Sequence, residues 1–91
     1  MTAVQYATKF AEFVALNEYG EKGKGMYPED RYGVRVRNKN EAIEHGWMPG
    51  ALATITYEGG VDLIELAGQF KRDKDFYLEP YSSYMVGVYK L

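Results

Sequence analysis

The sequence predicts an α+β domain in which an N-terminal amphipathic helix packs on a mostly antiparallel sheet of four to five strands. Three observations predict it: apolar residues recur at helical spacing over residues 3–17, apolar and polar residues alternate from residue 32 onward, and turn signals separate the segments. A chain of 91 residues is expected to form a single compact domain, residues 1–91. A small SH3-like barrel with an added helix is the alternative, because short strands in a meander can also close into a barrel.

The helix is predicted to begin with a capping box, because Gln5 follows Thr2 at the spacing that lets each side chain accept from the other residue's backbone N–H. The next apolar residues recur at spacings of three and four along one face: Ala3, Tyr6, Ala7, Phe10, Phe13 and Val14. The opposite face is polar and neutral, whereas a helix lying on a membrane surface is rich in Lys and Arg. We therefore expect this helix to cover a sheet.

The following segment, at about residues 18–31, is predicted to be a mobile glycine-rich loop. Gly20, Gly23, Gly25 and Pro28 interrupt regular structure there. Loops this long in a small domain are usually either functional or mobile. Residues 20–23 match the G-x-x-G backbone clamp of KH domains, but the match is weak because that loop joins two helices and here a proline and a predicted strand follow.

Residues 32–38 are predicted to form a strand with Tyr32, Val34 and Val36 on one face and Arg35 and Arg37 on the other. The two arginines are then about 7 Å apart, a spacing that suits successive phosphates or two carboxylates. The alternative interpretation is a solvated strand face whose arginines protect a sheet edge.

Two local signals follow this strand. Asn40 is expected to cap a short helical turn over residues 41–44, which Gly46 can end. Pro49 and Gly50 suit the central positions of a type II turn.

Residues 51–58 and 61–67 are predicted to form a β-hairpin, because the Gly59-Gly60 pair between them can adopt the positive φ values of a two-residue loop. This register places Tyr57 opposite Asp62. It assigns Ala53, Ile55, Tyr57, Ile64 and Leu66 to the core.

The C-terminal part is predicted to contain a polar turn over residues 70–75 and strands over residues 76–79 and 84–91. Pro80 is expected to mark a bend or a sheet edge, because proline cannot donate to a strand ladder.

The residues offer little for catalysis. The chain has no cysteine and one histidine, His45, and a pair of His45 with Glu41 supplies too few ligands for zinc. Ser82 and Ser83 lack the G-x-S-x-G pattern of a nucleophilic serine. Asp62 is expected to accept a hydrogen bond from Tyr57. We therefore expect a protein that is not an enzyme, with no cofactor and no metal site.

Charge is unevenly distributed along the chain. The segment from residue 21 to residue 40 carries +3, and since the whole chain carries −2, the remainder carries −5. The near-neutral total argues against nucleic-acid binding through overall basicity, while the basic stretch over residues 22–39 keeps a local anion site open. Lys22, Lys24, Arg35 and Arg37 are the candidate residues for such a site.

Tyrosine is unusually frequent, with nine residues. Tyr6, Tyr32 and Tyr57 fall on predicted core faces, whereas Tyr89 and the binding candidates have no clear place in a core. Those candidates are Tyr19, Tyr27, Tyr77, Tyr81 and Tyr84. Because exposed tyrosines are enriched at protein interfaces, they favour binding as the activity. The alternative interpretation is an ordinary half-buried sheet that uses these side chains for packing.

We therefore expect a small non-catalytic protein-binding module, an effector or inhibitor that masks a larger partner. Phages and mobile elements encode many such proteins, although no residue here indicates that origin. The alternative is a nucleic-acid or phosphorylated-ligand binder that uses residues 22–39. No targeting or membrane segment is recognised, so the expected location is cytoplasmic, without a membrane partner. A homodimer through exposed strands is a further expectation.

Overall fold

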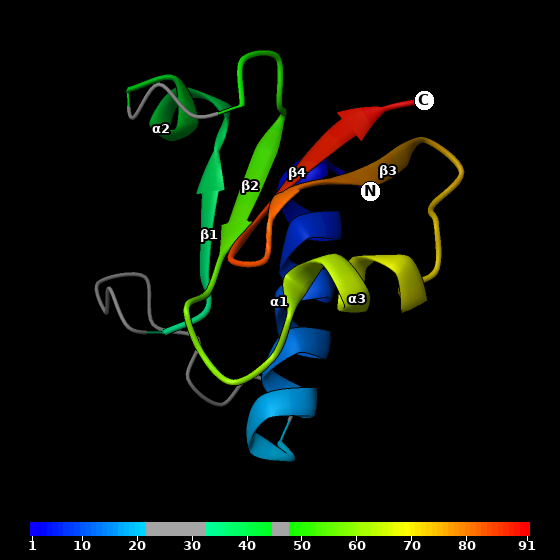
Figure 1. Ribbon diagram of the computed structural model, residues 1–91. Helices are drawn as coiled ribbons and strands as arrows, with labels where there is room; N and C mark the ends of the chain where they lie inside the picture. The colour runs from blue at the N-terminus through cyan, green and yellow to red at the C-terminus, as the bar shows by residue number, and fades with distance from the viewer. Residues whose placement is uncertain (22–32, 45–47) are drawn as a thin grey trace.

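The computed structural model describes residues 1–21, 33–44 and 48–91, with the backbone alone for residues 42–44. These ranges contain, in chain order, α1 (Ala3–Tyr19), β1 (Arg35–Asn38), α2 (Lys39–Glu44), β2 (Ala53–Thr56), α3 (Leu63–Gln69), β3 (Phe76–Ser82) and β4 (Met85–Lys90). Figure 1 shows the strands fanning across the molecule, with α1 running along the sheet and α3 beside it.

The four strands form one open antiparallel sheet in the order β1-β2-β4-β3. In the described part of the chain, β1 and β3 are therefore the edge strands (Figure 1). The predicted helix on a four-stranded antiparallel sheet is confirmed. The alternative of a closed barrel is wrong, because no strand pairing joins β1 to β3.

The capping box at the start of α1 is confirmed. The Thr2 hydroxyl accepts from the Gln5 backbone N–H at 3.1 Å, and the Thr2 N–H donates to the Gln5 side chain at 2.7 Å. The helix continues through Tyr19, which lies beyond the predicted end. It ends at Gly20, whose φ of +76° suits glycine and whose N–H donates to the Leu16 carbonyl.

The core lies between the sheet and the two longer helices. Alternate residues of the central strands point toward α1 and α3, namely Ala53 and Ile55 from β2 and Val86 and Val88 from β4. The buried residues of α1 pack against them: Tyr6, Ala7, Phe10, Ala11, Val14 and Ala15. Phe13, expected in the core, is only half-buried.

The predicted hairpin over residues 51–67 is wrong. Its second half forms α3 instead, and β2 pairs with β1 on one side and β4 on the other. Leu63 and Leu66 are buried one helical turn apart, whereas Ile64, which was expected in the core, is 49% exposed. A short apolar run fits both the helical and the strand period, so its tertiary contacts decide which structure forms.

The predicted turn at Pro49-Gly50 is confirmed. Gly50 has a φ of +89°, and the Ala51 N–H donates to the Met48 carbonyl at 3.0 Å, as in a type II turn.

The predicted helical turn near residue 41 is present as α2, but Asn40 does not cap it. The Asn38 side chain accepts from the Glu41 N–H at 3.0 Å, and the Glu41 carboxylate accepts from the Asn38 N–H at 2.9 Å. This reciprocal pair starts the helix two residues earlier, so that Asn40 lies inside it.

Pro80 lies on an edge strand, as predicted, but it does not end the strand. β3 continues to Ser82, and its pairing with β4 shifts register between Pro80 and Ser82. Proline is tolerated on an edge strand because its missing N–H removes no ladder bond on the open side.

Candidate functional site

Three of the predicted binding residues, Lys22, Lys24 and Tyr27, lie outside the described residues, as do Tyr32 and His45. The loop expected at about residues 18–31 is described only at its start. There α1 extends through residues 18 and 19, so any loop begins after Tyr19.

Tyr19 contacts the core residue Tyr57. Its hydroxyl oxygen lies 3.0 Å from that of Tyr57, and the two rings meet edge to face with centroids 6.2 Å apart. Tyr57 is buried just after β2, so this contact joins the C-terminal end of α1 to the sheet. Burial, the hydrogen bond with Tyr19 and the charge of Glu18 raise the pKa of Tyr57. Tyr57 bonds to Tyr19, and the expected bond to Asp62 is absent, because Asp62 caps α3 by accepting from the Ile64 N–H at 2.8 Å.

Arg35 and Arg37 lie on the sheet face away from α1 and α3, opposite Thr56 and Thr54 of β2. Arg37 is only 7% exposed, and its Nη1 donates to the Thr56 hydroxyl at 2.8 Å. Burial and the neighbouring Arg35 charge lower the pKa of Arg37, while Glu41 opposes this shift. Arg37 is thus held within the sheet, and Arg35 is half-buried beside it.

Tyr77 also belongs to this outer face. Its ring stacks on Tyr89 across the β3–β4 pair, with centroids 5.8 Å apart. Tyr89 packs in turn against a small apolar cluster of Met48, Ala51 and Met85. Burial and the nearby charge of Glu79 raise the pKa of Tyr89. Tyr77 is therefore a half-buried part of the sheet surface.

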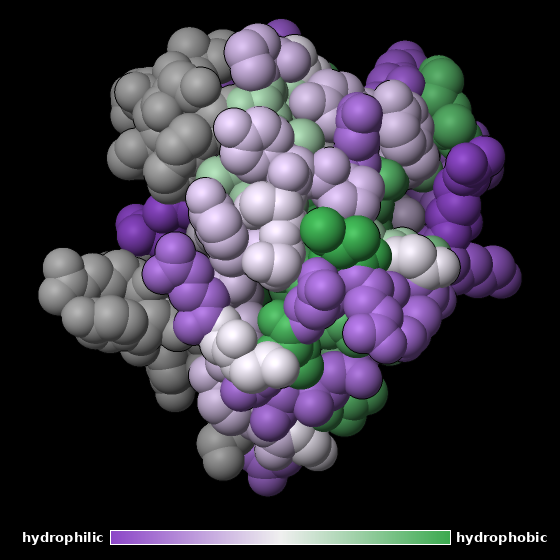
Figure 2. Space-filling model, viewed as in Figure 1, coloured by the Kyte–Doolittle hydropathy of each residue, from purple (hydrophilic) through white to green (hydrophobic). Residues whose placement is uncertain are grey.

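Tyr81 and Tyr84 flank the turn between β3 and β4 and are 66% and 42% exposed. Together with Ile64 they form what we call the hairpin surface. Backbone bonds hold this end in place: the Leu63 N–H donates to the Ser83 carbonyl at 2.9 Å, and the Tyr57 N–H donates to the Tyr84 carbonyl at 3.0 Å. Figure 2 shows apolar residues reaching the surface around the position of α3.

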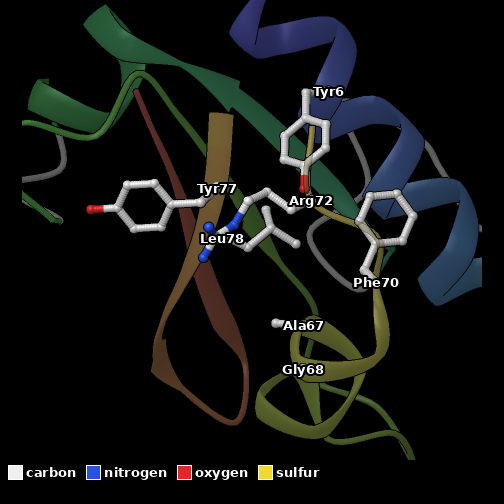
Figure 3. A pocket seen from close by; sticks show the side chains of 7 residues that line it. All are labelled: Tyr6, Ala67, Gly68, Phe70, Arg72, Tyr77 and Leu78. Atoms are coloured by element: carbon white, nitrogen blue, oxygen red, sulfur yellow. The ribbon is translucent and has the colours of Figure 1, made fainter. Parts of the chain in front are cut away.

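A hollow of about 190 Å³ opens between α3, residues 70–72 and β3 (Figure 3). Its lining consists of Tyr6, Ala67, Gly68, Phe70, Arg72, Tyr77 and Leu78. The Tyr6 hydroxyl donates to the Lys71 carbonyl at 3.0 Å, and burial raises the pKa of Tyr6. This hollow was not predicted, because the sequence assigned most of α3 to a strand and so gave Gly68 and Arg72 no common site.

The described residues hold no group of three or more His, Cys, Asp or Glu side chains placed to bind a metal. Ser82 has a local role, since its hydroxyl accepts from the Tyr84 N–H at 3.3 Å in the turn. Over the same residues, no helix combines the length and the apolar character needed to cross a bilayer.

Comparison with known protein families, with curated proteins and with solved structures finds no match to this chain.

Proposed function

We propose that this chain is a non-catalytic protein-binding module that docks through the hairpin surface of Ile64, Tyr81 and Tyr84. The observation that carries the proposal is the exposure of two tyrosines on a turn that backbone hydrogen bonds tie to α3 and to the end of β2. Tyrosine provides a large contact area with few rotatable bonds, and a rigid support lowers the entropy lost on binding. Such residues are the ones that dominate binding energy at interfaces.

We further propose a masking role, as an effector or inhibitor of a larger partner. The accessible surface is 5519 Å². A standard interface covers about 800 Å² on each partner, so docking through one end uses only a modest share of this surface. We also propose an origin in a phage or mobile element. Identifying the neighbouring genes in the source genome tests this origin.

Site-specific photo-crosslinking tests the docking surface. A photoreactive phenylalanine analogue replaces Tyr81 in one sample and Leu16, an exposed residue of α1, in the other. After irradiation in a lysate of the source cells, we expect a discrete protein adduct from position 81 and none from position 16, with mass spectrometry identifying the partner. Equal labelling from both positions would count against the hairpin surface.

The double variant Tyr81→Ala, Tyr84→Ala measures the contribution of the hairpin surface once the partner is known. We expect its affinity to fall at least about tenfold, because truncated aromatic hot spots each cost more than about 1 kcal/mol. Leu16→Ala is the matched control and should bind like the unmodified chain. An affinity unchanged in the double variant contradicts the proposal, and a crosslink to the chain itself would identify a homodimer.

A nucleic acid or phosphorylated ligand at β1 is the second candidate. Arg35 and Arg37 share one strand face, and the Arg35 charge adds to burial in lowering the pKa of Arg37. A bound phosphate would relieve this repulsion. The candidate predicts binding of a single-stranded oligonucleotide that weakens steeply between about 50 and 200 mM salt and drops in Arg35→Gln. Binding that responds to neither change rules it out.

A further inference from the structure

We propose that the hollow beside β3 is a peptide-binding groove, in which an acidic, extended segment of a partner protein pairs as an additional strand with the first half of β3. The inference rests on the proposed function in taking a protein as the partner. It concerns a different surface from Ile64, Tyr81 and Tyr84, and it names the chemistry of the segment that binds.

The first half of β3 has an open backbone edge. In the described part of the chain β3 pairs with β4 alone, so its other side presents backbone N–H and C=O groups. Proteins commonly protect such edges with proline or a bulge. Here Pro80 and the register shift that follows it protect only the second half. Residues 76–79 contain neither a proline nor a bulge, and they are the residues next to the hollow.

The hollow lies where alternate side chains of an added strand would point. Tyr77 and Leu78 line it from β3, and Ala67 and Gly68 line it from α3. In an extended chain every second side chain faces the same way, so a strand paired with residues 76–79 directs one set of its side chains toward α3. Peptide recognition by strand addition uses this arrangement: backbone bonds supply affinity, and a pocket for alternate side chains supplies specificity.

Gly68 keeps this groove open. It belongs to α3, and a Cβ built on it would meet no atom within 4 Å. Neither close packing nor a positive φ therefore requires glycine at this position. Glycine destabilises a helix relative to alanine, so neither helix stability nor packing explains its presence here. A side chain at position 68 would extend into the region that an added strand would occupy.

Arg72 determines the charge of the expected occupant. Among the described residues that line the hollow, only Arg72 is charged. Figure 3 shows its side chain extending across the hollow toward β3. It forms no ion pair within the described residues. A guanidinium binds a carboxylate through two parallel hydrogen bonds, so a glutamate or aspartate on the added strand is the complementary group.

A short synthetic peptide of alternating threonine and valine, with one central glutamate and blocked ends, is the probe. Its matched control carries glutamine in place of glutamate. Titrated into ¹⁵N-labelled protein, the glutamate peptide should shift the amide signals of residues 76–79 and of Gly68 and Arg72. We expect it to bind about tenfold more tightly than the glutamine peptide. Equal binding of the two peptides, or shifts elsewhere only, overturns the proposal.

Three variants locate the interaction. Arg72→Gln should abolish the preference for glutamate, and Gly68→Leu should weaken both peptides by filling the groove. Lys71→Gln removes the neighbouring charge, which does not line the hollow, and should retain the preference. Arg72, Gly68 and Lys71 are all exposed, so each variant is expected to keep the amide spectrum of the folded chain. A preference for glutamate that survives Arg72→Gln overturns the proposal.

The same reagents separate this inference from the proposed function. Tyr81→Ala with Tyr84→Ala should leave peptide binding unchanged, because neither residue lines the hollow. If the crosslinked partner loses affinity in the tyrosine double variant but not in Arg72→Gln, the groove is overturned and the hairpin surface stands. If the glutamate peptide binds as expected while position 81 captures nothing, the groove stands and the hairpin surface fails.

Discussion

At the scale of single residues, the two threonines of β2 differ in how their hydroxyls are satisfied. Thr54 is fully buried, and within the described residues its hydroxyl has no hydrogen-bond partner. Thr56, two residues further along the same strand, accepts from Arg37. An unpaired buried hydroxyl costs free energy that an apolar group of the same shape avoids.

Thr54→Val should therefore stabilise the chain, with the free energy of unfolding rising by about 1 kcal/mol. Thr56→Val is the matched control and should lower it by a similar amount, because it removes the acceptor for Arg37. Urea denaturation followed by circular dichroism measures both changes. A loss of stability in Thr54→Val would show that the hydroxyl has a favourable interaction in solution.

The raised pKa of Tyr57 predicts how the stability of the fold depends on pH. Its pKa in the folded chain is raised, whereas an unfolded tyrosine titrates near 10. The folded state therefore holds the Tyr57 proton more tightly, so this residue stabilises the fold below about pH 10 and that contribution is lost as the pH rises further. Urea midpoints should fall as the pH rises above about 10, and they should fall less in Tyr57→Phe. In the control Tyr81→Phe, at an exposed position, the urea midpoint should fall with pH as it does in the unmodified chain. If the midpoint of Tyr57→Phe falls with pH just as steeply, Tyr57 is not the source of the pH dependence.

At the scale of elements, α3 marks where reasoning from the sequence gave the wrong structure. Gly59-Gly60 favoured a hairpin, but Leu63 and Leu66 also repeat at helical spacing after a residue able to cap a helix, Asp62. Seven residues are too few for either period to exclude the other. The helix forms because burial of both leucines on the sheet stabilises it, while a strand would have placed Leu63 outside the core.

Asp62→Ala should lower the free energy of unfolding by about 1 kcal/mol, because the Ile64 N–H loses its acceptor. Asp62→Asn retains a capping oxygen and should keep most of the stability. Thermal denaturation of the three chains measures the difference. If both variants lose stability equally, the effect comes from the charge of Asp62 and not from its capping bond.

At the scale of the whole molecule, one core joins α1, α3 and the inner sheet face. Phe10 is fully buried and meets Phe70 edge to face, with centroids 5.3 Å apart. Since stability is concentrated in one cluster of a short chain, the loss of a central aromatic ring should affect the entire fold.

Phe10→Ala should cost about 3–5 kcal/mol, a large share of the roughly 5–15 kcal/mol that stabilises an ordinary domain. We expect a strongly lowered melting temperature by circular dichroism. Phe13→Ala removes a half-buried ring of the same helix and should cost clearly less. Equal losses in the two variants would show that Phe13 is as important to the core as Phe10.

The sequence itself determined the features that depend only on residues close together in the chain. The capping box of α1 and the turn at Pro49-Gly50 each follow from a residue type at a particular place. The high exposure of Tyr81 and Tyr84 also agrees with the expectation that a core has no place for them.

Only the tertiary structure decided the strand order, the identity of α3 and the partners of the candidate residues. Tyr19 bonds to Tyr57 across 38 positions of sequence, and the hollow exists only where α3, residues 70–72 and β3 meet. These outcomes depend on which segments bury apolar surface together. Local conformational preferences are weak compared with that burial, so a short segment adopts the structure that its distant neighbours stabilise.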